Sequence, residues 1–243
     1  MDVLGDLVAR SRRSDAPALL APALGRTYDY RRLCTNAWKV GNFLRHLGVR
    51  SGRTVALADD PAPEPVLSLF GGALLGASVR FDRPADRPVD ARALVVPFDR
   101  VEAYEVPPGT QRVAYGDAPE DPSVAYFERD VWSENPTEPP DRVAPGTTLL
   151  RTADATYTHR RVLAAAREVV DRWGLTAEDR VAVRAPLARP GAVVAGVVAP
   201  VLVGGSTVLA GAGPSTAVPD CGYAVAEGDA PEARVVAPGD ALE

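Results

Sequence analysis

Residues 149–170, "LLRTADATYTHRRVLAAAREVV", decide the expected fold, because an earlier stretch of the chain is built in the same way. That stretch is residues 25–60, "GRTYDYRRLCTNAWKVGNFLRHLGVRSGRTVALADD". The TY and RR pairs at 156–157 and 160–161 match those at 27–28 and 31–32, and after a short gap Gly174 and Val181 match Gly48 and Val55. A period this long indicates two copies of one supersecondary unit.

Each copy predicts the same order of elements. Two short extended segments form a hairpin-like pair, and a helix with one apolar face follows. Asp29 and Thr158 stand where a helix N-cap is expected, and Gly48 and Gly174 stand at the helix ends. A strand, an apolar helix and a second strand complete the unit, at 54–58, 64–75 and 77–81 in the first copy and at 181–185, 190–203 and 206–210 in the second.

Strands that alternate with helices predict an α/β protein with mostly parallel sheets and packed helices. Further strands are expected at 93–98, 112–116, 124–132, 223–227 and 233–237. The proline-rich stretch 133–146 predicts a linker. We therefore expect two similar α/β subdomains, residues 1–140 with the first copy and extra strands, and residues 141–243 with the second copy and a short tail.

The composition is that of a globular protein rather than of a nucleic-acid-binding or membrane protein. Of the 243 residues, 46% are hydrophobic and 24% are charged, and the net charge is −5. This charge gives no reason to expect nucleic acid. The apolar run 192–203 is shorter than a membrane span, and the N-terminus lacks the pattern of a signal peptide, so a cytoplasmic protein is expected. Cys34 and Cys221 fit no metal or redox spacing.

Both copies resemble the large domain of the AMP-forming acyl-CoA synthetases and other adenylating ligases. Residues 25–79 resemble the first characteristic stretch of that family, and "TYTHRRVLAAA" with the following residues to 209 resembles the stretch after its phosphate loop. The resemblance spans roughly residues 4–83 and 145–209. It implies two similar α/β subdomains, as in the synthetase large domain, and a chain that corresponds to only part of a synthetase.

The chemical parts that this family implies do not match. Its Ser/Thr/Gly phosphate loop with a lysine is replaced by "RTADA" at 151–155, which we interpret as a tight turn between two strands, with Asp154 as a turn residue. "YTH" at 157–159 is explained by a hairpin that leads into a capped helix. The glycine runs at 71–78 and 202–207 come after helices, which indicates packing rather than a phosphate cradle. Lys39 is the only lysine and is expected within a helix.

If the chain binds a small molecule, the site is expected in the cleft between the subdomains, where the carboxyl ends of parallel strands meet. Its walls are predicted to be Asp59 and Asp60 after one strand, residues 186–189 after a second and residues 211–215 after a third. Arg189, which replaces a histidine or aromatic residue of the family motif, is the candidate anion ligand. The candidate ligand-binding residues are Arg189, Thr158, His159, Gly211, Gly213 and Ser215.

Our first functional hypothesis is a degenerate synthetase-like protein without adenylation activity, acting as an accessory or interaction protein. Its partner would be a full-length synthetase or a second copy of itself. The alternatives are a protein that binds an acyl, CoA or adenylate group, and a residual AMP-forming ligase. No catalytic residue, metal or cofactor is expected, and neither nucleic acid nor a membrane is an expected partner.

Overall fold

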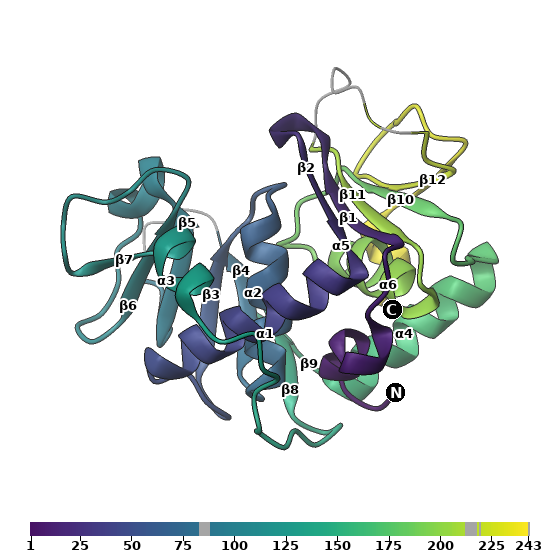
Figure 1. Cartoon of the computed structure of the whole chain (residues 1–243). Coiled ribbons are helices and arrows are strands. Elements are labelled where there is room, and N and C mark those ends of the chain that lie inside the picture. Colours follow the sequence, from purple (N-terminus) through teal and green to yellow (C-terminus); the bar gives the residue numbers. More distant parts are fainter. Residues whose placement is uncertain (83–87, 212–217, 219, 243) are drawn as a thin grey trace.

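The computed structural model describes residues 1–82, 88–211, 218 and 220–242. Two sheets stand next to each other, with helices packed on them (Figure 1). The seven-stranded sheet has the order β7-β6-β5-β3-β4-β8-β9, and its strands are β3 (Thr54–Ala58), β4 (Ser78–Asp82), β5 (Ala93–Pro97), β6 (Gln111–Tyr115), β7 (Val124–Tyr126), β8 (Thr148–Arg151) and β9 (Thr156–Thr158). The six-stranded sheet has the order β13-β12-β10-β11-β1-β2, and its strands are β1 (Pro17–Ala21), β2 (Arg26–Asp29), β10 (Arg180–Val183), β11 (Ser206–Leu209), β12 (Tyr223–Val225) and β13 (Arg234–Val236).

Both sheets are parallel except at one edge. β2 pairs antiparallel with β1, and β9 pairs antiparallel with β8, while every other described pair of neighbours is parallel. The predicted α/β class with mostly parallel sheets is confirmed. In a parallel sheet the carboxyl ends of the strands lie at one edge, so the loops that follow them gather there.

The two hairpins are exchanged between the sheets. The hairpin β1–β2, from the first copy, joins the sheet of the second copy, where Leu19 of β1 is in register with Thr207 of β11. The hairpin β8–β9, from the second copy, joins the sheet of the first, where Leu150 of β8 is in register with Val79 of β4. The predicted division at residues 140 and 141 remains a prediction, but the sheets do not follow it, because each takes a hairpin from across it.

Helix α1 (Tyr30–His46) and helix α4 (His159–Trp173) each follow a hairpin directly. Both begin as the sequence predicts: the Asp29 carboxylate accepts the Arg32 N–H at 2.6 Å, and the Thr158 hydroxyl accepts the Arg161 N–H at 3.2 Å. Gly174 ends α4 with φ of +67°, the left-handed conformation that glycine adopts without strain.

Helix α2 (Pro63–Leu74) follows β3, α5 (Pro190–Val193) follows β10 and α3 (Phe127–Ser133) follows β7. Helix α2 is continuous, whereas the matching helix of the second copy is divided into α5, a π-helical turn η5 (Val194–Val198) and α6 (Ala199–Val203). Pro200 has no N–H to donate to the carbonyl of Gly196, and the hydroxyl of Thr207 donates to that carbonyl instead, at 2.9 Å.

The prediction of a strand at residues 124–132 is wrong in part. Of residues 124–132, only β7 is extended, and residues Phe127–Ser133 form helix α3. Phe127 and Val131 are both fully buried at helical spacing, so packing of this face outweighs the β-propensity of the segment. Residues 134–147, which overlap the linker expected at 133–146, carry no regular element.

Short 3-10 turns complete the fold: η1 (Leu4–Val8), η2 (Arg10–Arg12), η3 (Pro22–Leu24), η4 (Phe98–Ala103) and η6 (Pro238–Ala241). The segment of η1 and η2 contacts helices of both copies. The Leu4 N–H donates to His159 of α4, the Trp38 indole of α1 donates to the Val8 carbonyl, and the Arg12 guanidinium donates to two carbonyls of α6. One buried cluster of apolar side chains therefore runs through both halves.

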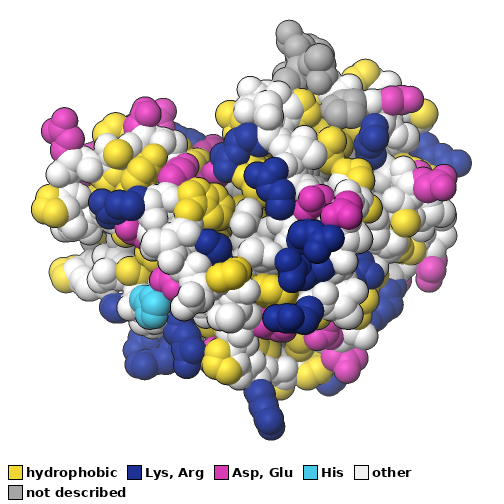
Figure 2. Space-filling view, in the orientation of Figure 1, with side chains coloured by type: hydrophobic (Ala, Val, Ile, Leu, Met, Phe, Trp, Pro, Cys, Tyr) yellow, Lys and Arg dark blue, Asp and Glu magenta, His cyan; other side chains and the backbone are white. Residues whose placement is uncertain are grey.

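The glycine run at 71–78 packs two helices together. A Cβ added at Gly71 of α2 would lie 2.7 Å from the Val40 side chain and 2.9 Å from the Gly41 nitrogen, both on α1. This confirms the interpretation of that run as packing. The molecule has two lobes separated by a notch, and the face in Figure 2 carries basic, acidic and hydrophobic side chains intermingled.

Candidate functional site

The turn between β8 and β9 occupies the place where the family resemblance implies a phosphate loop. The Thr152 hydroxyl accepts the Asp154 N–H at 3.3 Å and the Ala155 N–H at 3.0 Å, and the Thr152 N–H donates to the Ala155 carbonyl at 2.9 Å. The predicted tight turn is confirmed. Three backbone donors that a phosphate cradle would need are already used inside the turn.

A small cavity lies where the carboxyl ends of β3, β10 and β11 approach one another. It measures about 120 Å³ and is lined by Asp59, Asp60, Pro186 and Gly211, among others. The carboxylate of Asp59 accepts the Ala188 N–H at 3.2 Å. The carboxylate of Asp60 accepts the Tyr115 hydroxyl at 2.6 Å and pairs with Arg100.

The predicted cleft therefore exists, with part of its predicted lining. As the described residues form it, the cleft is smaller than the roughly 300 Å³ at which ligand pockets begin. Its lining includes the carboxylates of Asp59 and Asp60, and the Asp60 carboxylate is paired with Arg100. Burial, with the negative charge of Asp60 beside it, raises the pKa of the Tyr115 hydroxyl, which therefore donates and does not ionise.

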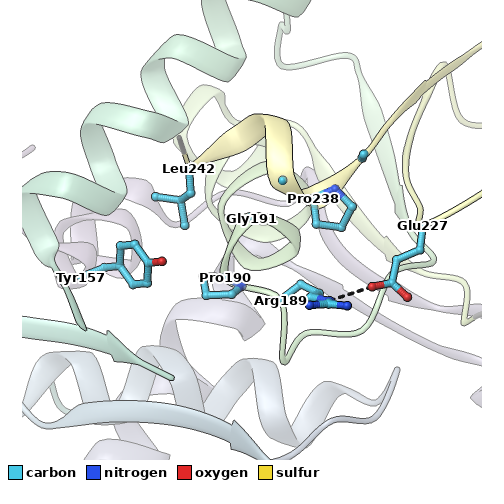
Figure 3. Close-up of a pocket in the computed structure, with 9 residues that line it drawn as sticks. Tyr157, Arg189, Pro190, Gly191, Glu227, Pro238 and Leu242 are labelled. Carbon is cyan, nitrogen blue, oxygen red and sulfur yellow. Dashed lines mark hydrogen bonds and ion pairs between the residues drawn. The ribbon is translucent and has the colours of Figure 1, made fainter. Parts of the chain in front are cut away.

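A larger cavity of about 650 Å³ lies beside the six-stranded sheet (Figure 3). Tyr157 comes from β9, Arg189 and Pro190 stand at the start of α5, and Glu227 follows β12. The far wall belongs to the tail segment around η6, where Pro238 and Leu242 line the space. This size is within the range of small-molecule sites.

Charge is concentrated at one end of this cavity. The Arg189 Nε donates to the Glu227 carboxylate at 2.7 Å, and both side chains are exposed, 65% and 47% respectively. At the other end Leu242 and the ring of Tyr157 are apolar, and the Tyr157 hydroxyl points toward the centre (Figure 3). The arrangement suits an elongated ligand with one polar end.

The tail approaches α5 closely because residue 191 is glycine. A Cβ added at Gly191 would lie 1.7 Å from the Pro238 carbonyl oxygen, a distance that no side chain allows. The Arg172 guanidinium of α4 donates to the Asp240 carbonyl at 3.0 Å and holds the same segment from the other side. The cavity wall is thus fixed by contacts to two helices.

The other candidate residues lie apart from this cavity. Thr158 caps α4, and His159 has no exposed surface. The His159 Nδ1 accepts the Leu4 N–H at 3.0 Å, and its Nε2 is buried without a hydrogen-bond partner in the described chain. Burial lowers the pKa of His159 to about 4, although Asp6 acts in the opposite direction. The histidine is therefore neutral near pH 7.

Gly211 lines the cleft, whereas the candidates Gly213 and Ser215 lie outside the described residues. Arg189 was expected in the cleft with Asp59 and Asp60, and it instead lines the larger cavity. Within the described ranges, no group of three or more His, Cys, Asp or Glu side chains could hold a metal ion. A search of the same residues for a helix long and apolar enough to cross a membrane finds none.

Sequence reasoning missed Tyr157, Glu227 and the tail residues of the larger cavity. For Glu227 a signal existed, since it ends a predicted strand and parallel strands present such residues at a binding edge. For Pro238 and Leu242 the sequence offers no comparable signal, because only the docking of the tail on α5 brings them there.

Solved structures with similar folds are CoA ligases and related proteins. The anthranilate CoA ligase AuaEII in complex with anthranoyl-AMP superposes with a TM-score of 0.73 at 22% identity, covering 85% of this chain and 44% of that chain. A putative long-chain-fatty-acid CoA ligase from Rhodopseudomonas palustris gives 0.70 at 21% identity, covering 85% and 56%. The N-terminal domain of FACL13 from Mycobacterium tuberculosis gives 0.67 at 16% identity, covering 94% and 58%.

No protein-family model and no curated protein matches the sequence. The resemblance to AMP-forming ligases is therefore confirmed for the fold: the chain has the two-sheet α/β architecture found in these ligases. It spans about half the length, 44% to 58%, of the three structures described. At identities near 20% the similarity carries no activity over to this chain.

Proposed function

We propose that this chain uses the AMP-forming ligase fold without adenylating a carboxylic acid. The main observation behind this proposal is the hydrogen bonding of the turn at residues 152–155. Adenylation develops negative charge on phosphate oxygens, and catalysis requires donors preorganised around them. In this turn the amides of Thr152, Asp154 and Ala155 bond within the turn, and the Asp154 carboxylate adds repulsion.

The first prediction is that the protein catalyses no pyrophosphate exchange with ATP, whatever carboxylic acid is added. The assay follows radiolabelled pyrophosphate into ATP, with a complete acyl-CoA synthetase as the positive control. Acid-dependent exchange that disappears in the Asp154→Ala or Thr152→Ala variants would contradict the proposal and restore the residual ligase.

A binding role is supported by a separate observation, the cavity beside Arg189. The cavity has the volume of a small-molecule site, one guanidinium at its charged end and an apolar end at Leu242. We propose that the chain binds a small anion with an apolar body there. The accessory role, with a full-length synthetase or a second copy as partner, remains a hypothesis.

The second prediction concerns thermal stability. A ligand at about 100 times its dissociation constant stabilises the folded state by about 2.7 kcal/mol, which raises the melting temperature by roughly 5–10 °C in a protein of this size. We expect a small aromatic or aliphatic carboxylate to give such a shift, and ATP to give none. Loss of the shift in Arg189→Ala places binding at this cavity, and a shift with ATP alone contradicts the proposal.

A further inference from the structure

We propose that Glu227 is an internal ligand of Arg189 and that it restricts entry of anions to the cavity. This inference rests on the proposed binding function and adds its regulation. The Glu227 carboxylate accepts the Nε–H of Arg189 at 2.7 Å and neutralises the guanidinium, so an anion that is to accept the same Nε–H must exchange with this carboxylate.

The geometry of the pair is held by the backbone on both sides. The N–H groups of Arg184 and Ala185 donate to the Val225 carbonyl at 2.9 and 2.8 Å, which joins the end of β12 to the segment that leads to Arg189. The Ala226 N–H donates to the Val236 carbonyl at 3.1 Å and fixes the residue before Glu227. These bonds bring the two backbones near each other, which places the exposed side chains of Arg189 and Glu227 within reach of their ion pair.

Because the pair lies at one end of the cavity, it can act as an electrostatic gate, meaning that it sets the charge that an entering anion meets. Arg189 and Glu227 stand together at one end of the cavity, while the apolar surfaces of Pro190, Pro238 and Leu242 lie beyond them (Figure 3). With the pair closed, the charged end of the cavity is neutral overall. With the carboxylate moved aside, the same end presents an unneutralised guanidinium that can form a bidentate bond with a planar carboxylate.

The pair is also weak enough to exchange. Both side chains are about half exposed or more, 65% and 47%, so water screens their attraction and competes for both partners. Exposed ion pairs contribute little to stability. An entering carboxylate gains an equivalent bond to Arg189 and, in addition, buries its apolar body in the cavity. Exchange therefore favours anions with an apolar body over small inorganic anions.

The test measures benzoate binding by titration calorimetry to the wild-type chain and to three variants. Glu227→Gln removes the competing charge, Arg189→Ala removes the anion ligand, and Asp171→Asn is the matched control, because it makes the same change in net charge at an exposed position of α4. The exposed ion pair has to be broken in the wild type and in Asp171→Asn but not in Glu227→Gln. We therefore expect Glu227→Gln to bind benzoate roughly two- to fivefold more tightly than the wild type. Asp171→Asn should bind as the wild type does, and Arg189→Ala should not bind.

The possible results distinguish failure of the proposed gate from failure of the proposed binding site. If Arg189→Ala abolishes binding and Glu227→Gln binds no more tightly than wild type, the binding site stands and the gate is wrong. If no form binds benzoate, both proposals fail. The Nε–H resonance of Arg189 in an NMR spectrum tests the contact without a ligand. It should shift in Glu227→Gln, and on addition of benzoate it should move toward its wild-type position; no shift in that variant overturns the gate.

Discussion

His159 lies at the start of a helix, where the sequence places it, and its candidate role as a ligand-binding residue stays a prediction. It belongs to the "YTH" stretch that predicts a hairpin leading into a capped helix, and the structure places it as the first residue of α4, with no exposed surface. Its Nδ1 accepts the Leu4 N–H and so fastens the N-terminal segment to α4. The capping role of the neighbouring Thr158 was predictable from local sequence, whereas the partner of His159 lies 155 residues away and was not.

The burial of His159 predicts that the free energy of unfolding depends on pH. The folded-state pKa of His159 is lowered to about 4 from an ordinary value of 6.5, so protons bind more tightly to the unfolded chain. The stabilisation is fully present above pH 6.5 and is lost as the pH falls through this window toward 4. We expect the free energy of unfolding to fall there by up to roughly 1.4 kcal/mol per pH unit from this residue alone.

Urea unfolding at a series of pH values measures this pH dependence of the free energy of unfolding, with His159→Gln as the comparison. Glutamine keeps an acceptor for the Leu4 N–H and does not titrate, so the variant should lose less stability on acidification. Equal pH slopes for wild type and variant would mean that His159 does not titrate in the way its burial implies.

At the scale of elements, the sequence predicted what is local and failed where packing decides. The helices α1 and α4 were predictable because apolar positions recur at helical spacing between a capping side chain and a glycine. The pairing of the hairpin β1–β2 with β11 was not, because period-two patterning says which face is buried but not which strand lies alongside. Helix α3 was taken for a strand for the same reason: a short apolar run fits either element until its neighbours are known.

Docking of the tail on α5 is the element-level contact that forms the larger cavity, and Gly191 makes it possible. In Gly191→Ala the new methyl group would overlap the Pro238 carbonyl, so the tail must move away or α5 must shift. We expect a loss of about 1–3 kcal/mol in stability, the usual cost of overpacking, together with faster proteolysis of residues 237–242.

Gly228→Ala is the control, because an added Cβ there meets no atom within 4 Å and the backbone is not in the left-handed region. Thermal melts and timed proteolysis followed by mass spectrometry compare the two variants with the wild type. If Gly191→Ala behaves as Gly228→Ala does, the tail does not dock as described and the cavity lacks its far wall.

At the scale of the whole molecule, the exchanged hairpins make the two sheets interdependent. Neither sheet is complete without strands from the other copy, and the N-terminal segment bonds to helices on both sides through Leu4, Val8 and Arg12. A chain of two contiguous subdomains, as the sequence suggested, could lose one and keep the other. A chain with exchanged hairpins loses strands from both sheets when either one opens.

We therefore predict that a core substitution in one sheet lowers the stability of both by the same amount. Leu209 of β11 is 1% exposed, and Leu209→Ala should cost about 2–5 kcal/mol. Hydrogen exchange followed by mass spectrometry reads the opening free energy of peptides from β10, in the same sheet, and from β6, in the other. Equal losses of protection in the two peptides are expected, because both exchange through one global opening. Loss confined to β10 would show that the sheets open independently, and that the exchanged hairpins do not couple them.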